Sequence, residues 1–175
     1  MDAQRPMQVN MVLGTPIRQR GPAYTAVRIA EALAAARLDV RLFGQPNLWP
    51  GALRVPVVGR RPFPGAGLVA RSPHEPVKAF LRLFTERDVR RHLDRAAGPQ
   101  LVYTWGELPL RLAADLHARG VPVVREKINC AKAAAAAILA EAYAALGEPD
   151  ARPIPQRLIE KERQEMALAD AIFCP

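Results

Sequence analysis

Residues 7–44 read "MQVNMVLGTPIRQRGPAYTAVRIAEALAAARLDVRLFG", and this segment indicates the fold class. Residues 7–13 form a short apolar run typical of a buried strand. Residues 22–36 carry apolar side chains at helical spacing and begin with a proline, which suits the first turn of a helix. A second strand is expected over 38–44. The order strand, helix, strand is the unit from which parallel sheets are built.

The same alternation continues along the rest of the chain. The further expected strands are 53–59, 100–106, 121–127 and a final buried strand over 171–175; the further helices are 74–98, 107–120, 130–147 and 156–170; a long loop rich in proline and glycine is expected over 60–73. Strands that are continuous apolar runs favour a parallel sheet covered on both faces. The predicted fold is therefore α/β, a Rossmann-like, doubly wound parallel sheet with helices on both faces, as a single domain over residues 1–175.

Composition indicates an ordinary folded domain with a strong positive charge. The chain has 175 residues, 50% of them hydrophobic, and a net charge of +8. The charge alone suggests nucleic-acid binding, but acidic residues interrupt the densest basic segment, 86–95, which is typical of a solvated helix face. Cys130 and Cys174 form no metal-binding pattern, so we expect a reducing, cytoplasmic setting and no metal site. No apolar run resembles a signal peptide or reaches membrane-spanning length.

Ligands of an open parallel sheet bind beyond the carboxyl ends of its strands. Three loops are expected there: 14–22, 104–107 and 125–130. In the first, Gly21 lies next to Pro22 at the helix start, where an anion can approach backbone N–H groups, and Arg18 and Arg20 can add donors for phosphate. The alternative is that Gly21 only permits a tight turn and that the arginines point to water. The glycine spacing matches neither a dinucleotide-binding nor a Walker motif.

The other two loops also contribute polar side chains. Glu126, Lys127 and Asn129 directly follow an apolar strand, although Asn129 can also be the cap of the next helix. Trp105 is either a platform for stacking a sugar or a packing residue. The predicted residues of an acceptor and donor-phosphate cleft are Gly14, Arg18, Arg20, Gly21, Trp105, Glu107, Glu126, Lys127 and Asn129. No catalytic residue is indicated, because the three histidines are expected on the surface of helices.

Three segments together resemble a known family. They are the first unit quoted above, "GPQLVYTWGELPLRLAADLHARGVPVVREKIN" (98–129) and "EKERQEMALADAIFCP" (160–175). This order looks like the N-terminal half of a GT-B glycosyltransferase of retaining family 4, the group 1 transferases. The last segment is the most specific, because Glu162 lies eight residues before Asp170 and a short apolar strand follows, similar to the family's boundary motif.

The resemblance implies a two-domain enzyme that transfers a sugar from a nucleotide-sugar donor to an acceptor, which is not identified, with retention of configuration and without a metal or other cofactor. This chain would be the acceptor-side domain, and a C-terminal donor-binding domain, absent from this chain, would be supplied in cis or as a separate chain. The loop at Gly21 would border the donor diphosphate, and residues 126–129 would border the reacting centre. We expect the chain alone to be inactive, because glycosyl transfer needs both lobes to exclude water.

Two other function classes compete with this one. The first is a non-catalytic Rossmann-like module that binds an anion or a protein. The second is a nucleic-acid-binding protein, which rests on charge alone and lacks a recognisable motif, so no specific nucleic-acid partner is expected. A basic acceptor domain can also rest peripherally on anionic lipid, but no amphipathic segment requires it.

Overall fold

The computed structural model describes residues 6–58, 65, 68, 74–106, 108–127, 129–150 and 153–174. Its strands are β1 (Gln8–Leu13), β2 (Asp39–Phe43), β3 (Val57–Val58), β4 (Gln100–Trp105), β5 (Val123–Glu126) and β6 (Ala171–Phe173). They form one sheet in the order β3-β2-β1-β4-β5-β6, and every neighbouring pair is parallel. The order reverses at β1, as in a Rossmann sheet. The predicted α/β, doubly wound parallel sheet is confirmed.

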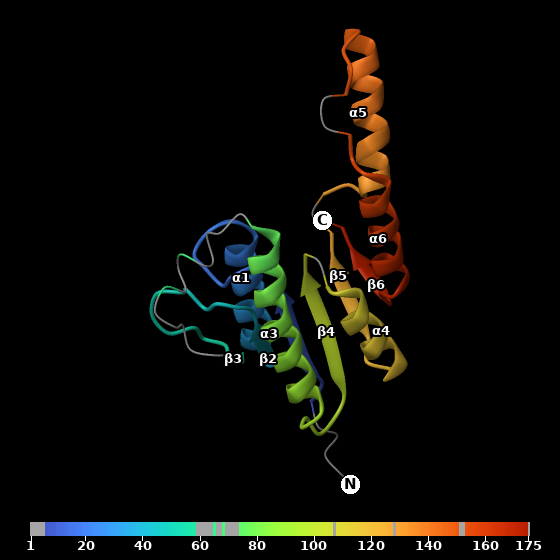
Figure 1. Cartoon of the computed structure of the whole chain (residues 1–175). Coiled ribbons are helices and arrows are strands. Elements are labelled where there is room, and N and C mark those ends of the chain that lie inside the picture. The colour runs from blue at the N-terminus through green and yellow to red at the C-terminus, as the bar shows by residue number, and fades with distance from the viewer. Residues whose placement is uncertain are drawn as a thin grey trace.

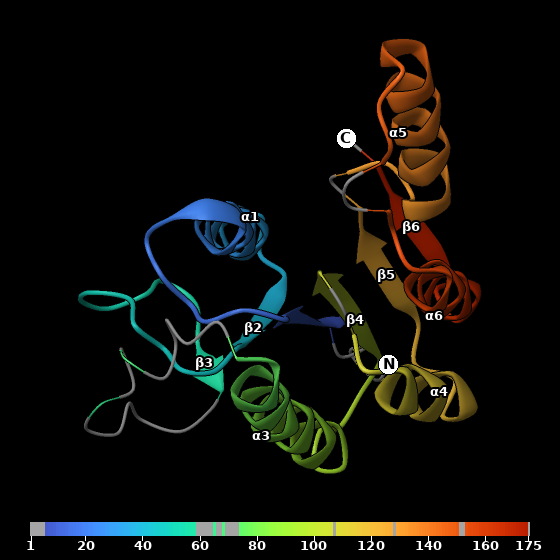
Figure 2. The same cartoon turned by 45° about the horizontal axis from the view of Figure 1, so that its top comes forward.

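The helices divide between the two faces of the sheet. α1 (Gly21–Ala35) covers one face, whereas α3 (Glu75–Leu93), α4 (Leu110–Ala118) and α6 (Gln156–Ala167) lie on the other (Figure 1, Figure 2). Right-handed crossovers produce this division. From β1 to β3 the chain adds strands toward one edge of the sheet, and from β4 to β6 it adds them toward the other edge, so the connecting helices lie on opposite faces. α5 (Lys132–Leu146) instead projects past the carboxyl ends of the strands, and none of its residues is buried (Figure 1).

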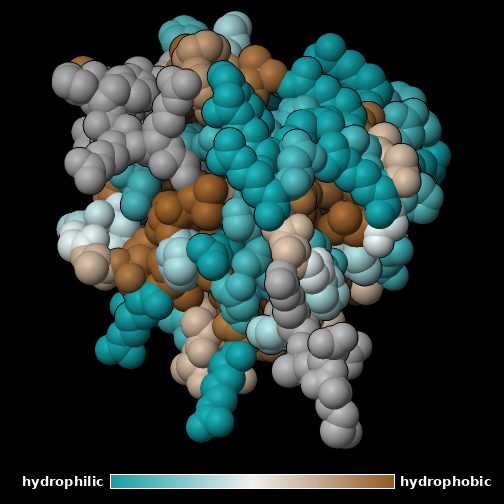
Figure 3. Space-filling model, turned by 90° about the horizontal axis from the view of Figure 1, so that it is seen from below, coloured by the Kyte–Doolittle hydropathy of each residue, from teal (hydrophilic) through white to brown (hydrophobic). Residues whose placement is uncertain are grey.

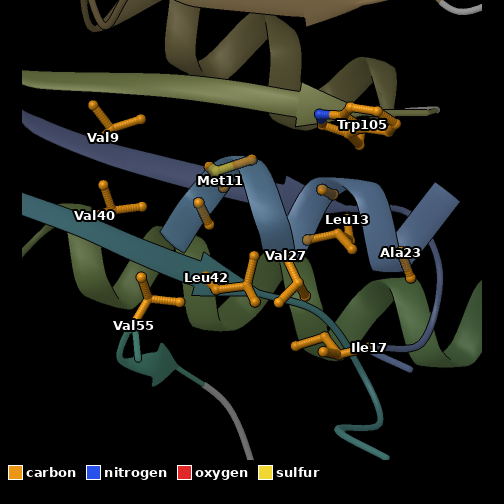
Figure 4. Packing of buried hydrophobic residues seen from close by; sticks show 12 residues of the cluster. Val9, Met11, Leu13, Ile17, Ala23, Val27, Val40, Leu42, Val55 and Trp105 are labelled. Atoms are coloured by element: carbon orange, nitrogen blue, oxygen red, sulfur yellow. The ribbon is translucent and has the colours of Figure 1, made fainter. Parts of the chain in front are cut away.

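Side-chain alternation along β1 supplies a core on each face. Met11 and Leu13 point toward α1 and pack with Val27 (Figure 4). Val12 points to the opposite face, where it belongs to the cluster that includes Leu112 of α4. Burial of an apolar side chain of this size stabilises the fold by about 1.5–3 kcal/mol. The carboxyl end of β1 is therefore held from both sides, which fixes the start of the loop that follows.

Two strands differ from the prediction. β3 is only Val57–Val58 instead of 53–59, because Pro56 has no N–H to donate to the ladder and can only accept, through its carbonyl, from Leu42. The expectation that 171–175 forms a buried strand is wrong: β6 pairs on one side only, its residues are exposed, and the Phe173 side chain is 55% exposed. The loop predicted over 60–73 lies outside the described residues, apart from Gly65 and Leu68.

One histidine also differs from the prediction. His92 of α3 is half-buried, its ring packs edge-on against Phe43, and its Nε2 lies 2.6 Å from Oε1 of Gln8. Burial lowers the pKa of His92, and the positive charge of Arg41 lowers it further. His74 and His117 are exposed, as expected.

The amino ends of the strands lie at the end of the molecule opposite to α5. Figure 3 shows this side, where separate hydrophobic patches lie among hydrophilic residues. Among the described residues, no helix has both the length and the apolar character that a membrane crossing requires.

Candidate functional site

The carboxyl ends of three neighbouring strands lie side by side. Leu13 at the end of β1 is paired with Trp105 at the end of β4, and Trp105 is paired in turn with Glu126 at the end of β5. The loops that leave these strands, which begin at residues 14, 106 and 127, therefore start from one edge of the sheet. This is the edge at which open α/β sheets bind their ligands.

A cavity of about 240 Å³ opens at this edge, and we call it the central cavity. Its lining residues are Leu13, Thr15, Pro22, Trp105, Gly106, Arg125, Glu126, Lys127, Asn129, Lys132 and Glu162. Pro22 belongs to the first turn of α1, so the positive end of that helix dipole borders the cavity. The wall thus combines cationic side chains, carboxylates and a helix N-terminus.

Glu162 of α6 organises the cationic side of the central cavity. Its Oε1 accepts from Nζ of Lys127 at 2.5 Å and from Nζ of Lys132 at 3.1 Å, and its Oε2 accepts from the backbone N–H of Lys132. Burial alone would raise the pKa of Glu162, but these hydrogen bonds outweigh burial and lower it to about 2. Glu162 is therefore an ionised carboxylate at neutral pH. Each ammonium group has three N–H donors and gives one to Glu162, so it can also hold a ligand oxygen.

Successive side chains of β5 point to opposite faces, as in any strand. Arg125 points to α6, where its guanidinium lies 2.9 Å from the carboxylate of Glu165, and both residues are only 4% exposed. Glu126 points to the α1 face and accepts a hydrogen bond from the hydroxyl of Tyr103. Burial raises the pKa of Tyr103, and the bond to Glu126 raises it further, so the phenol stays protonated at neutral pH.

Trp105 is a packing residue that also lines the central cavity. It is 6% exposed and belongs to the core cluster under α1. The ring is therefore not presented as an open platform for stacking in this structure.

The residues predicted from the first loop, 14–22, do not line a single cavity. Gly14 and Arg18 line a second cavity, between this loop and α3, while Gly21 and Arg20 are exposed and line neither cavity. Gly21 has a φ of +59°, a conformation that favours glycine, and a methyl group added there would meet no described atom within 4 Å. Of the other predicted residues, Trp105, Glu126, Lys127 and Asn129 line the central cavity, and Glu107 lies outside the described residues.

The sequence did not indicate three residues of this site. Lys132 and Glu162 line the central cavity, and Tyr103 donates a hydrogen bond to Glu126 beside it. The interpretation of Asn129 as a helix cap is wrong: α5 begins after Ala131, and the N–H of Lys132 donates to Glu162. That contact joins residues 30 positions apart, so no local pattern reveals it. The only signal was the position of Glu162 in the motif that resembles the glycosyltransferase boundary.

Comparisons of the chain with protein-family models, with curated proteins and with solved structures found no match. The fold by itself does not determine a function, because Rossmann-like sheets carry many unrelated activities. The chemistry of the residues around the central cavity is therefore the guide to function.

Proposed function

We propose that this chain is the acceptor-side lobe of a retaining glycosyltransferase that uses a nucleotide-sugar donor. The central cavity carries the proposal: it lies at the carboxyl ends of β1, β4 and β5 and combines two ammonium groups with the N-terminus of α1. An anionic diphosphate is favoured by both features, because a helix N-terminus and lysine side chains each stabilise negative charge. The sequence resemblance of 98–129 and 160–175 points to the same class.

The proposed reaction moves the sugar from the donor diphosphate to a hydroxyl of the acceptor. The bond between the anomeric carbon and the diphosphate oxygen breaks, a bond from that carbon to the acceptor oxygen forms, and the hydroxyl proton leaves with the released diphosphate. Negative charge develops on the departing diphosphate, so Lys127 and Lys132 would stabilise the transition state more than the ground state. Glu162 keeps both ammonium groups in place.

A second, donor-binding lobe would close over this edge, either in cis or as a separate chain. The apolar side chain of Phe173 supports this, because it is 55% exposed and is paired with Glu126 beside the central cavity. Exposed apolar surface next to a binding cavity is typical of an interface. Cys130 and Cys174 are free and exposed, which suits the reducing cytoplasmic setting that we propose for the reaction.

The experiment that tests the proposal uses the complete protein and a panel of uridine, guanosine and adenosine diphosphate sugars. We expect release of nucleoside diphosphate with at least one donor, and a loss of turnover of about tenfold or more in Lys127→Gln. Arg163→Gln is the matched control, because Arg163 is an exposed cation on α6 and does not line the central cavity. No release with any donor, or equal turnover of Lys127→Gln and the wild type, would overturn the proposal.

The same panel separates the competing classes. Saturable binding of a nucleoside diphosphate without turnover would favour a non-catalytic anion-binding module. A salt-dependent shift with random oligonucleotides would favour nucleic-acid binding instead.

A further inference from the structure

The second cavity has a volume of about 260 Å³ and lies between the loop after β1 and the N-terminal half of α3. Cations reach it from two separate segments. Arg18 comes from the loop, and Lys78 and Arg82 come from successive turns of α3, four residues apart and therefore on one side of the helix. None of the described residues that line it is acidic. In the central cavity, by contrast, Glu126 and Glu162 are themselves lining residues.

The polar groups around these cations suit a tetrahedral anion. Thr85 also lines this wall, but its hydroxyl donates to the backbone carbonyl of Leu81, so it has no further proton to donate to an anion. The Nε of Arg18 is buried with no hydrogen-bond partner among the described residues. Lys78 and Arg82 also have partners within the chain. A guanidinium has five N–H donors and an ammonium has three, so both can hold an additional oxygen. Arginine in particular binds phosphate through two parallel hydrogen bonds.

The second cavity adjoins the central cavity. Leu13 and Thr15 line both, so the end of β1 and the first turn of its loop form the wall between them. A ligand that crosses this wall can place an anionic group near Arg18 and another part of the molecule near Lys127.

We propose that the second cavity binds the phosphate monoester of a phosphorylated acceptor, whose reacting hydroxyl lies in the central cavity. This inference rests on the proposed glycosyltransferase function, which is what identifies the ligand as an acceptor. The anion site itself rests only on Arg18, Lys78 and Arg82 and their position in the wall.

The first test measures binding of inorganic phosphate to the full chain by calorimetry at low ionic strength. Arg18→Gln and Arg20→Gln form a matched pair, because both remove an arginine from the same loop but only Arg18 lines the cavity. We expect Arg18→Gln to raise the Kd for phosphate about tenfold, and Arg20→Gln to change it less than twofold.

Lys78→Gln, on the other wall, should also weaken binding. The melting temperatures of the two arginine variants should stay near that of the wild type, because Arg20 is exposed and Arg18 is half-buried and forms no hydrogen bond through its Nε. Absence of saturable phosphate binding, or equal effects of the matched pair, would overturn the site.

The second test decides which ligand brings the phosphate. Uridine diphosphate should bind without displacing inorganic phosphate; displacement would assign the second cavity to the donor and overturn the acceptor assignment. In the complete protein, Arg18→Gln should raise KM for hexose monophosphates about tenfold and leave KM for the donor unchanged. Transfer to free hexoses and hexose monophosphates with equal efficiency would refute the inference and leave the glycosyltransferase proposal intact. Phosphate binding that depends on Arg18, together with no sugar transfer at all, would support the anion site and refute the glycosyltransferase proposal.

Discussion

The carboxylate of Glu162 accepts a hydrogen bond from the backbone N–H of Lys132, so a side chain of α6 caps the first turn of α5. The first N–H groups of a helix have no partner within the helix, and an anionic acceptor there also interacts favourably with the dipole. α5 buries none of its residues. The attachment of α5 to the domain therefore depends strongly on Glu162. The same carboxylate also accepts hydrogen bonds from the side chains of Lys127 and Lys132 in the central cavity.

Glu162→Gln should lower the free energy of unfolding by about 2–3 kcal/mol, because an amide keeps the shape of the side chain but leaves both ammonium groups without their counter-charge. Urea unfolding measures this change. Glu160→Gln is the control, since Glu160 lies on the exposed side of α6, where its carboxylate accepts from Gln164 and lies near Arg163. Equal stabilities of the two variants would contradict the role assigned to Glu162.

Stability should also depend on the ionisation of Glu162. Its pKa is lowered from 4.5 to about 2 in the folded chain, so the unfolded chain binds the proton more tightly. The stabilising contribution is therefore complete above about pH 5 and is lost as the pH falls from about 4.5 to 2. Urea unfolding of the wild type and Glu162→Gln at several pH values should show a difference that shrinks over this range. A constant difference would contradict the assignment.

Arg125→Met should destabilise the chain by about 3–5 kcal/mol, because it leaves the carboxylate of Glu165 buried without its main partner. The double variant Arg125→Met, Glu165→Met removes both charges and should recover a large part of that loss. Chemical unfolding of both variants tests the pair. A double variant that is less stable than the single one would show that the ion pair is not what Arg125 contributes.

Gly21 allows a test of the loop that opens α1. Gly21→Val in the complete protein should reduce turnover of the nucleotide sugar, because a branched side chain disfavours the backbone conformation at φ +59° and would shift the adjacent Pro22, which lines the central cavity. Gly21→Asn should retain more activity, since asparagine tolerates this conformation. Global stability should fall by only about 1–2 kcal/mol in the valine variant. Full turnover in Gly21→Val would remove the loop from the reaction.

The sheet was predictable from sequence because its signals are local. β1, β4 and β5 lie inside the apolar runs 7–13, 100–106 and 121–127. Strands of a parallel sheet are covered by helices on both faces, so they are apolar along most of their length and appear in the sequence as such runs. Helix α1 followed from apolar spacing after Pro22. From these elements alone, the edge at which the loops leave the sheet could be inferred.

The remaining features depend on which elements become neighbours in space. Phe173 looks like a core residue in sequence, yet β6 is an edge strand and leaves it exposed. Arg18 and Arg20 have similar sequence surroundings, and only the position of α3 gives Arg18 a cavity to line. The sharing of Glu162 between Lys127 and Lys132 requires α6 to return beside the start of α5. None of these relationships leaves a periodic pattern in the chain.

The place of β1 in the sheet also has a consequence for synthesis of the chain. β1 is hydrogen-bonded to β2, which follows it closely, and to β4, which is synthesised much later. The side chain of Asn10 also donates to that of Gln100, 90 positions further along the chain. A nascent polypeptide that ends before β4 therefore exposes one long side of a strand whose six residues are all buried in the folded chain. Unpaired strand edges of this kind promote aggregation. Truncation before residue 100 should yield an insoluble product, whereas chains that extend past Trp105 can close the gap.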